Sequence, residues 1–442
     1  MKIQLSDHFV YSKLLRFTIP SIIMMIFTSI YSIIDGLFTS NFAGKIPFAA
    51  INLIMPLVML FSGLGFMFGT GGSALVSKYL GEEKLEKANR TFSFIVYAAI
   101  VFGIVMSAVF YFIIPSAAKF LGAKDEILKY SVMYARTLSF GVTAFMLQSI
   151  FQSFLIAAEK PQFGLALTLA AGFTNIILDA LFIGVFKWGV VGAALATDFS
   201  YVIGGIIPLV YFFTARTGKL RLGKSSFDVK ALLKTVTNGS SELMTNISSS
   251  IVGMLYNVML LKYAGVDGVA AYGVIMYVGM IFAAIFIGYS MGVAPVVSYN
   301  YGAENSSELK NLFNKSLVII SLVSVFMLIA SESAAGLLAS IFTSYDEALF
   351  NLTKKAFKIY SVGFLFCGLN IFGSSFFTAL NNGIVSALLA FVRTLIFQVA
   401  FILLFPVLLG SNGIWMASPA SEIFSMILTL SCFIALKKKY NY

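Results

Sequence analysis

Twelve apolar runs, each longer than 20 residues, follow one another along the chain and limit what it can fold into. A helix of about 20 apolar residues is long enough to cross the hydrocarbon core of a bilayer. With 59% hydrophobic and only 11% charged residues, and a mean hydropathy of +0.93, the chain is far too apolar for a soluble protein. We therefore expect an all-α polytopic membrane protein whose spans cover approximately residues 14–42, 48–79, 92–114, 127–158, 161–186, 190–213, 231–263, 269–301, 312–341, 349–380, 384–409 and 413–436.

The basic residues are unevenly divided between the two sides of the membrane. An even number of spans places both termini on one side, and the loops there carry 19 of the 30 Lys and Arg residues. Cytoplasmic loops of membrane proteins are enriched in Lys and Arg, so both termini are expected in the cytoplasm. The net charge of +11 then reflects topology, and no nucleic-acid partner is expected.

The two halves of the chain resemble each other. The segment Ser73–Gly81 (SALVSKYLG) aligns with Ala294–Gly302 (APVVSYNYG) at an offset of half the chain length, and the same offset pairs Gly44 with Gly265. Six spans return each half to its starting side, so the halves are parallel repeats related by an axis near the membrane normal. We expect two six-helix bundles with pseudo-twofold symmetry and a cavity between them. Their predicted bounds are an N-terminal lobe of residues 1–214, a cytoplasmic linker of residues 215–230 and a C-terminal lobe of residues 231–442.

Two polar residues, Asn175 and Asp179, lie inside the fifth apolar run. Their spacing of four residues places both side chains on one face of a helix. An ionised Asp near the bilayer centre costs about 2.5–3.5 kcal/mol even on the lenient insertion scales. A carboxylate at this depth therefore usually has a partner or a function.

Three other helices are expected to bring polar groups to the same layer. A turn of only four residues follows the fifth run, so Thr197 in the sixth run lies level with Asp179, roughly 12 Å below the membrane surface at about 1.5 Å per residue. Asp35 in the first run and Tyr134 in the fourth are predicted near this depth as well. Asp198 follows Thr197 and lies one residue deeper.

The second half does not repeat this acidic layer. Tyr256 stands at the position that corresponds to Asp35, and Phe401 stands near the position that corresponds to Asp179. Two other charges, Arg393 and Glu422, are predicted at mid-bilayer depth. Two separately buried charges would cost more than one compensated pair, so we expect an ion pair or a water-bridged contact between them.

These features resemble the multidrug and toxic compound extrusion transporters, the MATE family, over all twelve spans. The motifs that carry the resemblance are Ile19-Pro20 and Ile34-Asp35 in the first span, Pro161 and Asn175 to Asp179 in the fifth, Gly192 to Thr197 in the sixth, and Arg393 followed by Pro406 in the eleventh. Each motif alone is short, and their order in a repeated six-plus-six chain makes the combination specific.

The resemblance implies secondary active export of amphipathic, often cationic compounds, driven by inward flow of H⁺ or Na⁺ across a bacterial or archaeal plasma (inner) membrane. In the prokaryotic members with DinF-like features, it assigns the first lobe's cation site to Asp35, Asn175 and Asp179, with Thr197 and Tyr134 as further members. Asp198 departs from the apolar residue expected after the family's Thr. It either adds a carboxylate to this site or faces elsewhere.

Physical chemistry suggests how such a site would work. Desolvation and nearby like charge both favour the neutral acid, so Asp35 and Asp179 in one pocket are expected to share a proton, and an entering cation would relieve their repulsion. Sequence does not separate H⁺ from Na⁺. Pro20 lacks an N–H and its ring clashes with the preceding turn, so it is the expected hinge of the first helix.

The remaining predictions concern cargo and alternatives. Substrate-lining candidates are soft or polar side chains of the first, second, seventh and eighth spans: Tyr31, Met55, Tyr256, Asn257, Tyr277 and Met280. No cofactor is expected beyond the coupling ion, because the single histidine, His8, precedes the first span as a solvated residue and both cysteines suit helix packing. The chain is expected to act as a monomer in the bilayer and not as an enzyme. A lipid-linked saccharide flippase of the wider superfamily is the nearest rival, although it would need several cationic residues in its cavity, and an intramembrane enzyme is the rival of another class.

Overall fold

The computed structural model describes residues 3–214, 218–343 and 346–442, and these residues form helices without a strand. The α-helices are α1 (Tyr11–Phe38), α2 (Lys45–Gly81), α3 (Leu85–Phe120), α4 (Asp125–Leu138), α5 (Val142–Ala157), α6 (Pro161–Asp179), α7 (Gly189–Thr214), α8 (Val229–Gly302), α9 (Ser306–Thr343), α10 (Glu347–Ser361), α11 (Phe364–Ala379), α12 (Gly383–Phe391), α13 (Gln398–Leu409) and α14 (Ser411–Tyr440). Three π-helical segments continue them: η1 (Thr39–Ala43), η2 (Ala180–Val185) and η3 (Val392–Phe397).

The predicted twelve membrane passes are present in the described part of the chain. Nine helices there are long and apolar enough to cross a membrane, and two pairs bent by 58° (α4 with α5) and 46° (α10 with α11) each supply another span. The helix α8 makes two passes, because it reverses at Gly265, whose φ of 66° is in the left-handed region that favours glycine. Tyr256 and Tyr272 stack across this reversal with ring centroids 4.7 Å apart, whereas a straight helix would separate them by roughly 24 Å.

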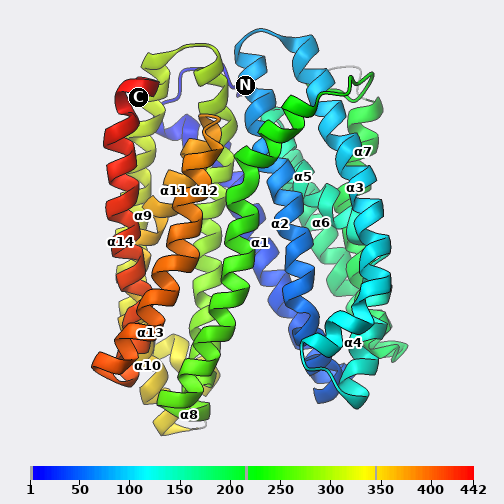
Figure 1. Ribbon diagram of the computed structural model, residues 1–442, viewed down its shortest axis with the longest axis vertical. Coiled ribbons are helices and arrows are strands. Elements are labelled where there is room, and N and C mark those ends of the chain that lie inside the picture. The colour runs from blue at the N-terminus through cyan, green and yellow to red at the C-terminus, as the bar shows by residue number, and fades with distance from the viewer. Residues whose placement is uncertain (1–2, 215–217, 344–345) are drawn as a thin grey trace.

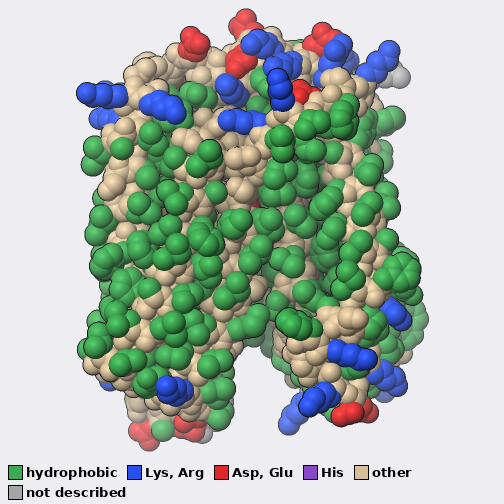
Figure 2. Space-filling view, viewed as in Figure 1, with side chains coloured by type: hydrophobic (Ala, Val, Ile, Leu, Met, Phe, Trp, Pro, Cys, Tyr) green, Lys and Arg blue, Asp and Glu red, His purple; other side chains and the backbone are tan. Residues whose placement is uncertain are grey.

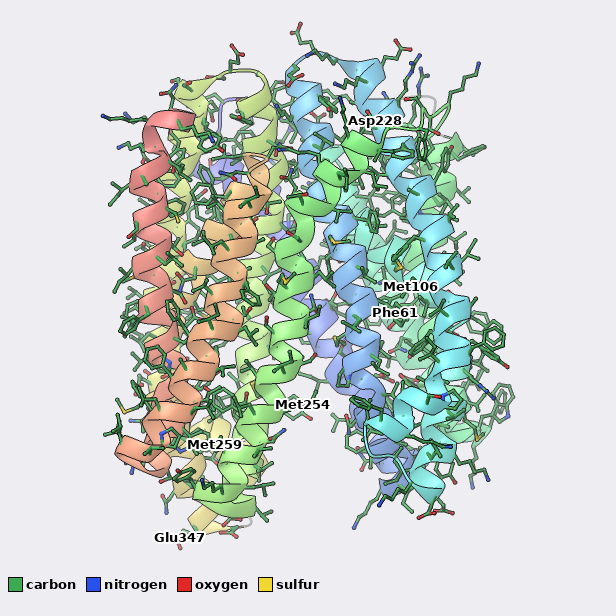
Figure 3. The ribbon with its side chains drawn as sticks, in the orientation of Figure 1. Phe61, Met106, Asp228, Met254, Met259 and Glu347 are labelled. Carbon is green, nitrogen blue, oxygen red and sulfur yellow. The ribbon has the colours of Figure 1, made fainter. Side chains whose placement is uncertain are left out.

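The helices stand in two lobes side by side, α1 to α7 in one and α8 to α14 in the other (Figure 1). Both termini lie at one end of the molecule, which we call the terminal end. Asp228, at the start of α8, lies at this end, and Glu347, at the start of α10, lies at the opposite far end (Figure 3). Lys and Arg side chains gather at the terminal end, apolar side chains cover the face between the ends, and a cleft separates the lobes at the far end (Figure 2).

Close backbone contacts join the lobes at the terminal end, and they follow the sequence repeat. A Cβ at Gly81 would lie 2.0 Å from the Tyr299 carbonyl oxygen, and a Cβ at Gly302 would lie 2.1 Å from the Lys78 carbonyl oxygen. Gly81 and Lys78 correspond to Gly302 and Tyr299 at the offset of half the chain length. The contact is therefore reciprocal, as a twofold axis between the lobes requires.

A second reciprocal contact lies further from the terminal end. A Cβ at Gly71 of α2 would lie 2.6 Å from the backbone nitrogen of Gly239, and a Cβ at Gly292 would lie 3.1 Å from Thr18 Cβ of α1. Gly71 corresponds to Gly292, and Thr18 corresponds to Gly239, at the same offset. Lipid tails are as apolar as the side chains of a helix, so close packing of this kind is what holds helices together in a bilayer.

Each lobe has its own apolar interior. Phe61 and Met106 belong to the core of the first lobe (Figure 3), where the Phe61 ring meets the Phe110 ring edge-on with centroids 4.8 Å apart. Such edge-to-face pairs contribute beyond their buried area.

The predicted linker of residues 215–230 includes residues 215–217, which lie outside the described residues. The described part runs along α3: Asn89 Nδ2 donates to the Lys219 carbonyl oxygen at 3.1 Å, and the Arg221 N–H donates to Asn89 Oδ1 at 2.7 Å. The Gly223 N–H donates to Ser93 Oγ at 3.0 Å. This segment is therefore fastened to the first lobe.

Candidate functional site

The helix α6 carries the two polar residues of the fifth span. Pro161 begins the helix, at the position where a missing N–H costs nothing. Asp179 is the last residue of α6 and the π-helical segment η2 follows it directly. Single π-helical turns within α-helices occur often at functional sites, because they change the direction of the side chains around them.

Asp35 of α1 and Asp179 of α6 meet in the interior of the first lobe. Their carboxyl groups lie close enough to interact strongly with each other, and the Asp179 side chain is fully buried. Two buried carboxylates this close repel each other unless one of them binds a proton or both share a cation. The pair is therefore arranged to hold a proton or a cation between α1 and α6.

A glycine allows the two helices to approach. A Cβ at Gly172 of α6 would lie 2.4 Å from Cε1 of the Phe27 ring and 3.0 Å from Cδ1 of the Tyr31 ring. Any larger residue at this position would push α1 away from α6. Gly172 thus brings Asp35 within reach of Asp179, two turns further along α6.

Asn175 and Thr197 lie beside the acid pair. Asn175 is 1% exposed, and its Nδ2 lies 3.5 Å from Thr197 Oγ1, a long contact at the limit of a hydrogen bond. The Thr197 hydroxyl donates its own proton to the Ala193 carbonyl oxygen at 2.9 Å. The Thr197 oxygen therefore keeps a lone pair available to a cation.

Several buried oxygen atoms in this region have no hydrogen-bond partner among the described residues. Those that belong to the site are Asp35 Oδ1, Asn175 Oδ1, and Asp179 Oδ1 and Oδ2. A buried acceptor without a donor costs free energy, and such atoms in a native protein call for an explanation. Acceptors that lack donors are the atoms to which a proton or an oxygen-seeking cation binds.

Tyr134 and Asp198 border the site from α4 and α7. Tyr134 is 2% exposed and lies close enough to Asp35, Asp179 and Asp198 to interact electrostatically with all three. The Asp198 carboxyl points at Gly141, between α4 and α5, where a Cβ would lie 1.9 Å from Asp198 Oδ1. No group of three His, Cys, Asp or Glu side chains among the described residues is placed to hold a metal ion, so Asp198 does not form a triad with the other two acids.

Arg136 does not neutralise the acids. Its guanidinium lies over the Tyr111 ring, 5.0 Å from the centroid, and its Nε has no hydrogen-bond partner within the described residues. None of the ion pairs found in the described ranges includes Asp35, Asp179 or Arg136. The acid pair is thus left without a compensating basic side chain.

Asp35 also borders a cavity between the lobes. The cavity has a volume of about 150 Å³. Its lining residues come from α1, η1, α2 and α8: Ser32, Ile33, Asp35, Gly36, Thr39, Phe48, Ile51, Asn52, Met55, Tyr277 and Met280. Three of the six substrate-lining candidates, Met55, Tyr277 and Met280, are among them.

The other three candidates lie elsewhere. Tyr31 lies beside Gln148 inside the first lobe. Tyr256 does not line the cavity, contrary to the prediction, because it is 2% exposed and stacks on Tyr272 inside the second lobe. Asn257 is exposed and lies on the same face of α8 as Gly239, because five helical turns separate the two residues. It lies beyond the part of that face that contacts α2.

The predicted contact between Arg393 and Glu422 is present in the second lobe. Arg393 Nη2 lies 2.9 Å from Glu422 Oε1, and Arg393 Nε lies 3.0 Å from both carboxylate oxygens. Asn370 Nδ2 donates to Glu422 Oε2 at 2.7 Å, and Thr429 Oγ1 donates to Asn370 Oδ1 at 3.1 Å. Unlike the acids of the first lobe, Glu422 is fully compensated.

Pro20, the predicted hinge, is buried within α1. It lies next to the surface that packs on α8, because a Cβ at Gly288 would lie 2.7 Å from the Ser21 carbonyl oxygen and 2.5 Å from Ile22 Cα. A bend of α1 at this point would therefore act on the contact between the lobes. Its role as a hinge stays a prediction.

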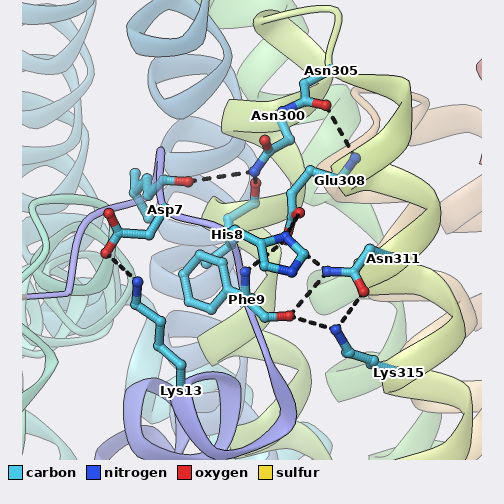
Figure 4. A network of polar contacts seen from close by, with 11 residues as sticks. Asp7, His8, Phe9, Lys13, Asn300, Asn305, Glu308, Asn311 and Lys315 are labelled. Atoms are coloured by element: carbon cyan, nitrogen blue, oxygen red, sulfur yellow. Dashed lines mark hydrogen bonds and ion pairs between the residues drawn. The ribbon is translucent and has the colours of Figure 1, made fainter.

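The segment before α1 carries His8, which is exposed, as predicted, and which also contacts the second lobe. His8 Nδ1 lies 2.6 Å from Glu308 Oε2, and the Phe9 N–H donates to Glu308 Oε1 at 2.9 Å (Figure 4). The Leu5 N–H donates to Glu159 Oε1 of the first lobe at 2.9 Å, while Asn300 Nδ2 of the second lobe donates to the Leu5 carbonyl oxygen at 3.4 Å. The segment therefore binds both lobes at the terminal end.

Comparisons with known proteins agree with this architecture. The sequence matches the MatE family in two segments, residues 20–181 and 243–404, one in each lobe. It is 25% identical over 430 residues to the multidrug export protein MepA of Staphylococcus aureus strain N315, covering 96% of this chain and 94% of that protein. It is 24% identical to MepA of Staphylococcus saprophyticus over 92% of this chain and 88% of that protein. The fold is similar to a solved structure of a multidrug resistance MATE family transporter in its outward-facing conformation, with a TM-score of 0.91, 23% identity and 98% of each chain covered. The chain therefore belongs to the MatE family and is a multi-pass membrane protein.

Proposed function

We propose that the chain is a secondary active multidrug exporter that exchanges H⁺ or Na⁺ for amphipathic or cationic organic compounds by alternating access. The observation that supports this most directly is the position of Asp35. This single carboxyl group lies beside the Asp179 carboxyl group inside the first lobe and also borders the cavity between the lobes. A cation that binds the acid pair and a compound that enters the cavity would therefore act on the same residue.

In this proposal the inward-moving cation occupies the oxygens of Asp35, Asp179, Asn175 and Thr197. A proton needs only one carboxyl group, whereas Na⁺ would use several oxygens. Binding of the cation relieves the repulsion between Asp35 and Asp179 and draws α1 towards α6. Each positive charge that moves inward through 100 mV supplies about 2.3 kcal/mol, enough for a concentration gradient of about fiftyfold.

The proposed orientation places the terminal end in the cytoplasm. The gathering of Lys and Arg side chains at that end supports it (Figure 2). The cleft at the far end would then open to the outside, and the state described here would be the one that releases cargo. The membrane would be the plasma (inner) membrane of a prokaryotic cell, in which the chain works as a monomer.

The proposal concerns transport rather than catalysis, and the character of the cavity favours cationic cargo. Asp35 is the one charged residue that lines it, and none of its lining residues is Lys or Arg. A flippase for a lipid-linked saccharide would need basic groups there for the pyrophosphate. The cavity is therefore better suited to a cation than to an anion.

Transport by the purified chain in liposomes tests the proposal. Efflux of a fluorescent organic cation is measured under an imposed pH gradient and, separately, under an imposed Na⁺ gradient. We expect one of the two gradients to drive efflux, and both Asp35→Asn and Asp179→Asn to abolish the driven component. Glu86→Gln, which removes an exposed carboxylate at the terminal end, serves as the matched control. Wild-type efflux by both Asp variants would show that the acid pair does not couple the ion to the cargo.

A further inference from the structure

A second acidic residue, Glu242, lies in the interface between the lobes and has no part in the proposed coupling site. It stands on α8, thirteen residues after Val229 and thus roughly 20 Å along the helix from the terminal end. Its neighbours on α8 contact α2: a Cβ at Gly239 would lie 1.9 Å from the Met67 carbonyl oxygen, and Asn246 Cβ lies 3.2 Å from where a Cβ of Gly63 would stand. The carboxyl group is therefore held where α2 and α8 close on each other.

Nothing in the described residues compensates the charge of Glu242. Its carboxyl oxygens take part in none of the ion pairs or side-chain hydrogen bonds found there. The side chain nevertheless keeps some accessible surface, so there is open space beside it. An ionised carboxylate without a partner at this depth costs several kcal/mol.

Neither α2 nor α12, which both pack on α8, offers an ionisable group at the level of Glu242. The α2 face that meets α8 consists of Gly63, Met67 and Gly71, and Lys78 lies further towards the terminal end. The helix α12, which also packs on α8, contains no ionisable residue. On α8 itself, Lys234 lies two turns towards the terminal end, where its Nζ donates to the Asn381 carbonyl oxygen at 2.8 Å.

Glu242 continues a row of polar residues on one face of α8. Asn238, Glu242, Thr245 and Ser249 recur at three- and four-residue intervals, which places them on one side of the helix. Asn238 donates through Nδ2 to Asn381 Oδ1 at 2.8 Å, but its own Oδ1 has no partner among the described residues. The face thus presents an acceptor oxygen that lacks a donor beside a carboxyl group that lacks a partner among the described residues.

We propose that Glu242 is a second cation site, which binds the cationic group of an exported compound when the lobes separate at the terminal end. The inference rests on the proposed export function and assigns it a residue that recognises cargo. With the lobes apart, water reaches the carboxyl group, its proton leaves to the terminal side, and the carboxylate forms an ion pair with the cation. With the lobes closed, as here, the carboxyl group carries a proton in place of the cation, so that α2 covers a neutral group.

Binding to the purified full-length protein in detergent tests the proposal without any gradient. The probes are tetraphenylphosphonium, a monovalent lipophilic cation, and triphenylphosphine oxide, a neutral molecule of related shape. We expect Glu242→Gln to weaken tetraphenylphosphonium binding by roughly 10- to 100-fold, the effect of losing one strong contact to a charged group, and to leave triphenylphosphine oxide binding unchanged. Glu86→Gln should bind both probes as the wild type does. In weakly buffered solution, tetraphenylphosphonium should release a proton from the wild type that Glu242→Gln does not release.

Several results would overturn the proposal. The first is that Glu242→Gln binds tetraphenylphosphonium as tightly as the wild type does. The second is that Glu242→Gln weakens the binding of both probes equally, which would mean a structural role. The third is that the wild type does not bind tetraphenylphosphonium. The transport assay reports separately on the exporter function. If the Asp35 and Asp179 variants transport normally while Glu242→Gln still loses the cation alone, the coupling assignment is wrong and the cargo site stands.

Discussion

Arg393 and Glu422 allow a quantitative test of how a charge pair is held in the second lobe. Arg393 gives Glu422 three contacts of 2.9–3.0 Å, and Asn370 supplies a fourth of 2.7 Å. Glu422 is 6% exposed, so water cannot replace the arginine. In Arg393→Met the carboxylate would keep only Asn370. Removing one partner of such a buried pair costs about 3–5 kcal/mol of unfolding free energy.

Substitution of the other partner, Glu422, should lower the unfolding free energy by a similar amount. Glu422→Gln would leave the guanidinium with a neutral amide and with Cys367 Sγ, which lies 3.3 Å from Nη2 and is a weak acceptor. The double variant Arg393→Met/Glu422→Leu removes both charges and keeps the site filled. Because replacing a buried pair by apolar residues is often close to neutral, it should unfold within about 2 kcal/mol of the wild type.

The assay is equilibrium unfolding of the purified protein in mixed micelles, followed for the wild type, both single variants and the double variant. The coupling free energy from this cycle isolates the pair from the packing changes of each substitution. If each single variant lost less than about 1 kcal/mol, the cost of an exposed ion pair, the pair would have to be hydrated and the reasoning from burial would be refuted.

Two further predictions concern the contacts that position the site and close the terminal end. Gly172→Val should reduce ion-driven efflux strongly, because the valine side chain would overlap the Phe27 ring and move α1 away from α6. Normal efflux would mean that the acid pair does not depend on the close contact between α1 and α6. Glu308→Gln should loosen the segment before α1, since one carboxylate oxygen of Glu308 contacts His8 and the other accepts from the Phe9 N–H. Amide hydrogen exchange of that segment should then become faster by about tenfold or more. Unchanged exchange would mean that other contacts hold the segment.

The sequence was a good guide wherever one property repeated over many residues. Apolar run length predicted twelve spans, and the repeat at half the chain length predicted the twofold relation that Gly81 and Gly302 now display in reciprocal contacts. Depth counting from short turns brought Asp35 to the level of Asp179, because each residue of a helix adds the same rise along its axis. The same counting brought Arg393 to Glu422.

Other features carry no such regularity. Tyr256 corresponds to Asp35 by the repeat and was expected at the cavity. The repeat does not specify how each side chain packs, and the Tyr256 ring stacks on Tyr272 inside the second lobe instead. The bends between α4 and α5 and between α10 and α11 lie within the single predicted spans 127–158 and 349–380, in which no proline indicates a break. The segment before α1 is held by contacts with Glu159 and Glu308, which are so distant in the chain that no local pattern reveals them.

Glu242 was missed although a signal was available. The prediction compared the two halves only at the positions equivalent to Asp35 and Asp179, where the second half has no acidic residue. The spacing of Asn238, Glu242, Thr245 and Ser249 would have shown a polar face on the seventh span. Read as a helix, that face indicates contact with water or another polar group inside the membrane.

The paired glycine contacts at the terminal end have a consequence for leakage. Two equivalent seams, Gly81 on Tyr299 and Gly302 on Lys78, straddle the twofold axis with main chain against main chain. In the proposed alternating access, a lobe that rocks as one body would strain both seams together, so that neither would open while the other stayed closed. The terminal end would then open to water in one step.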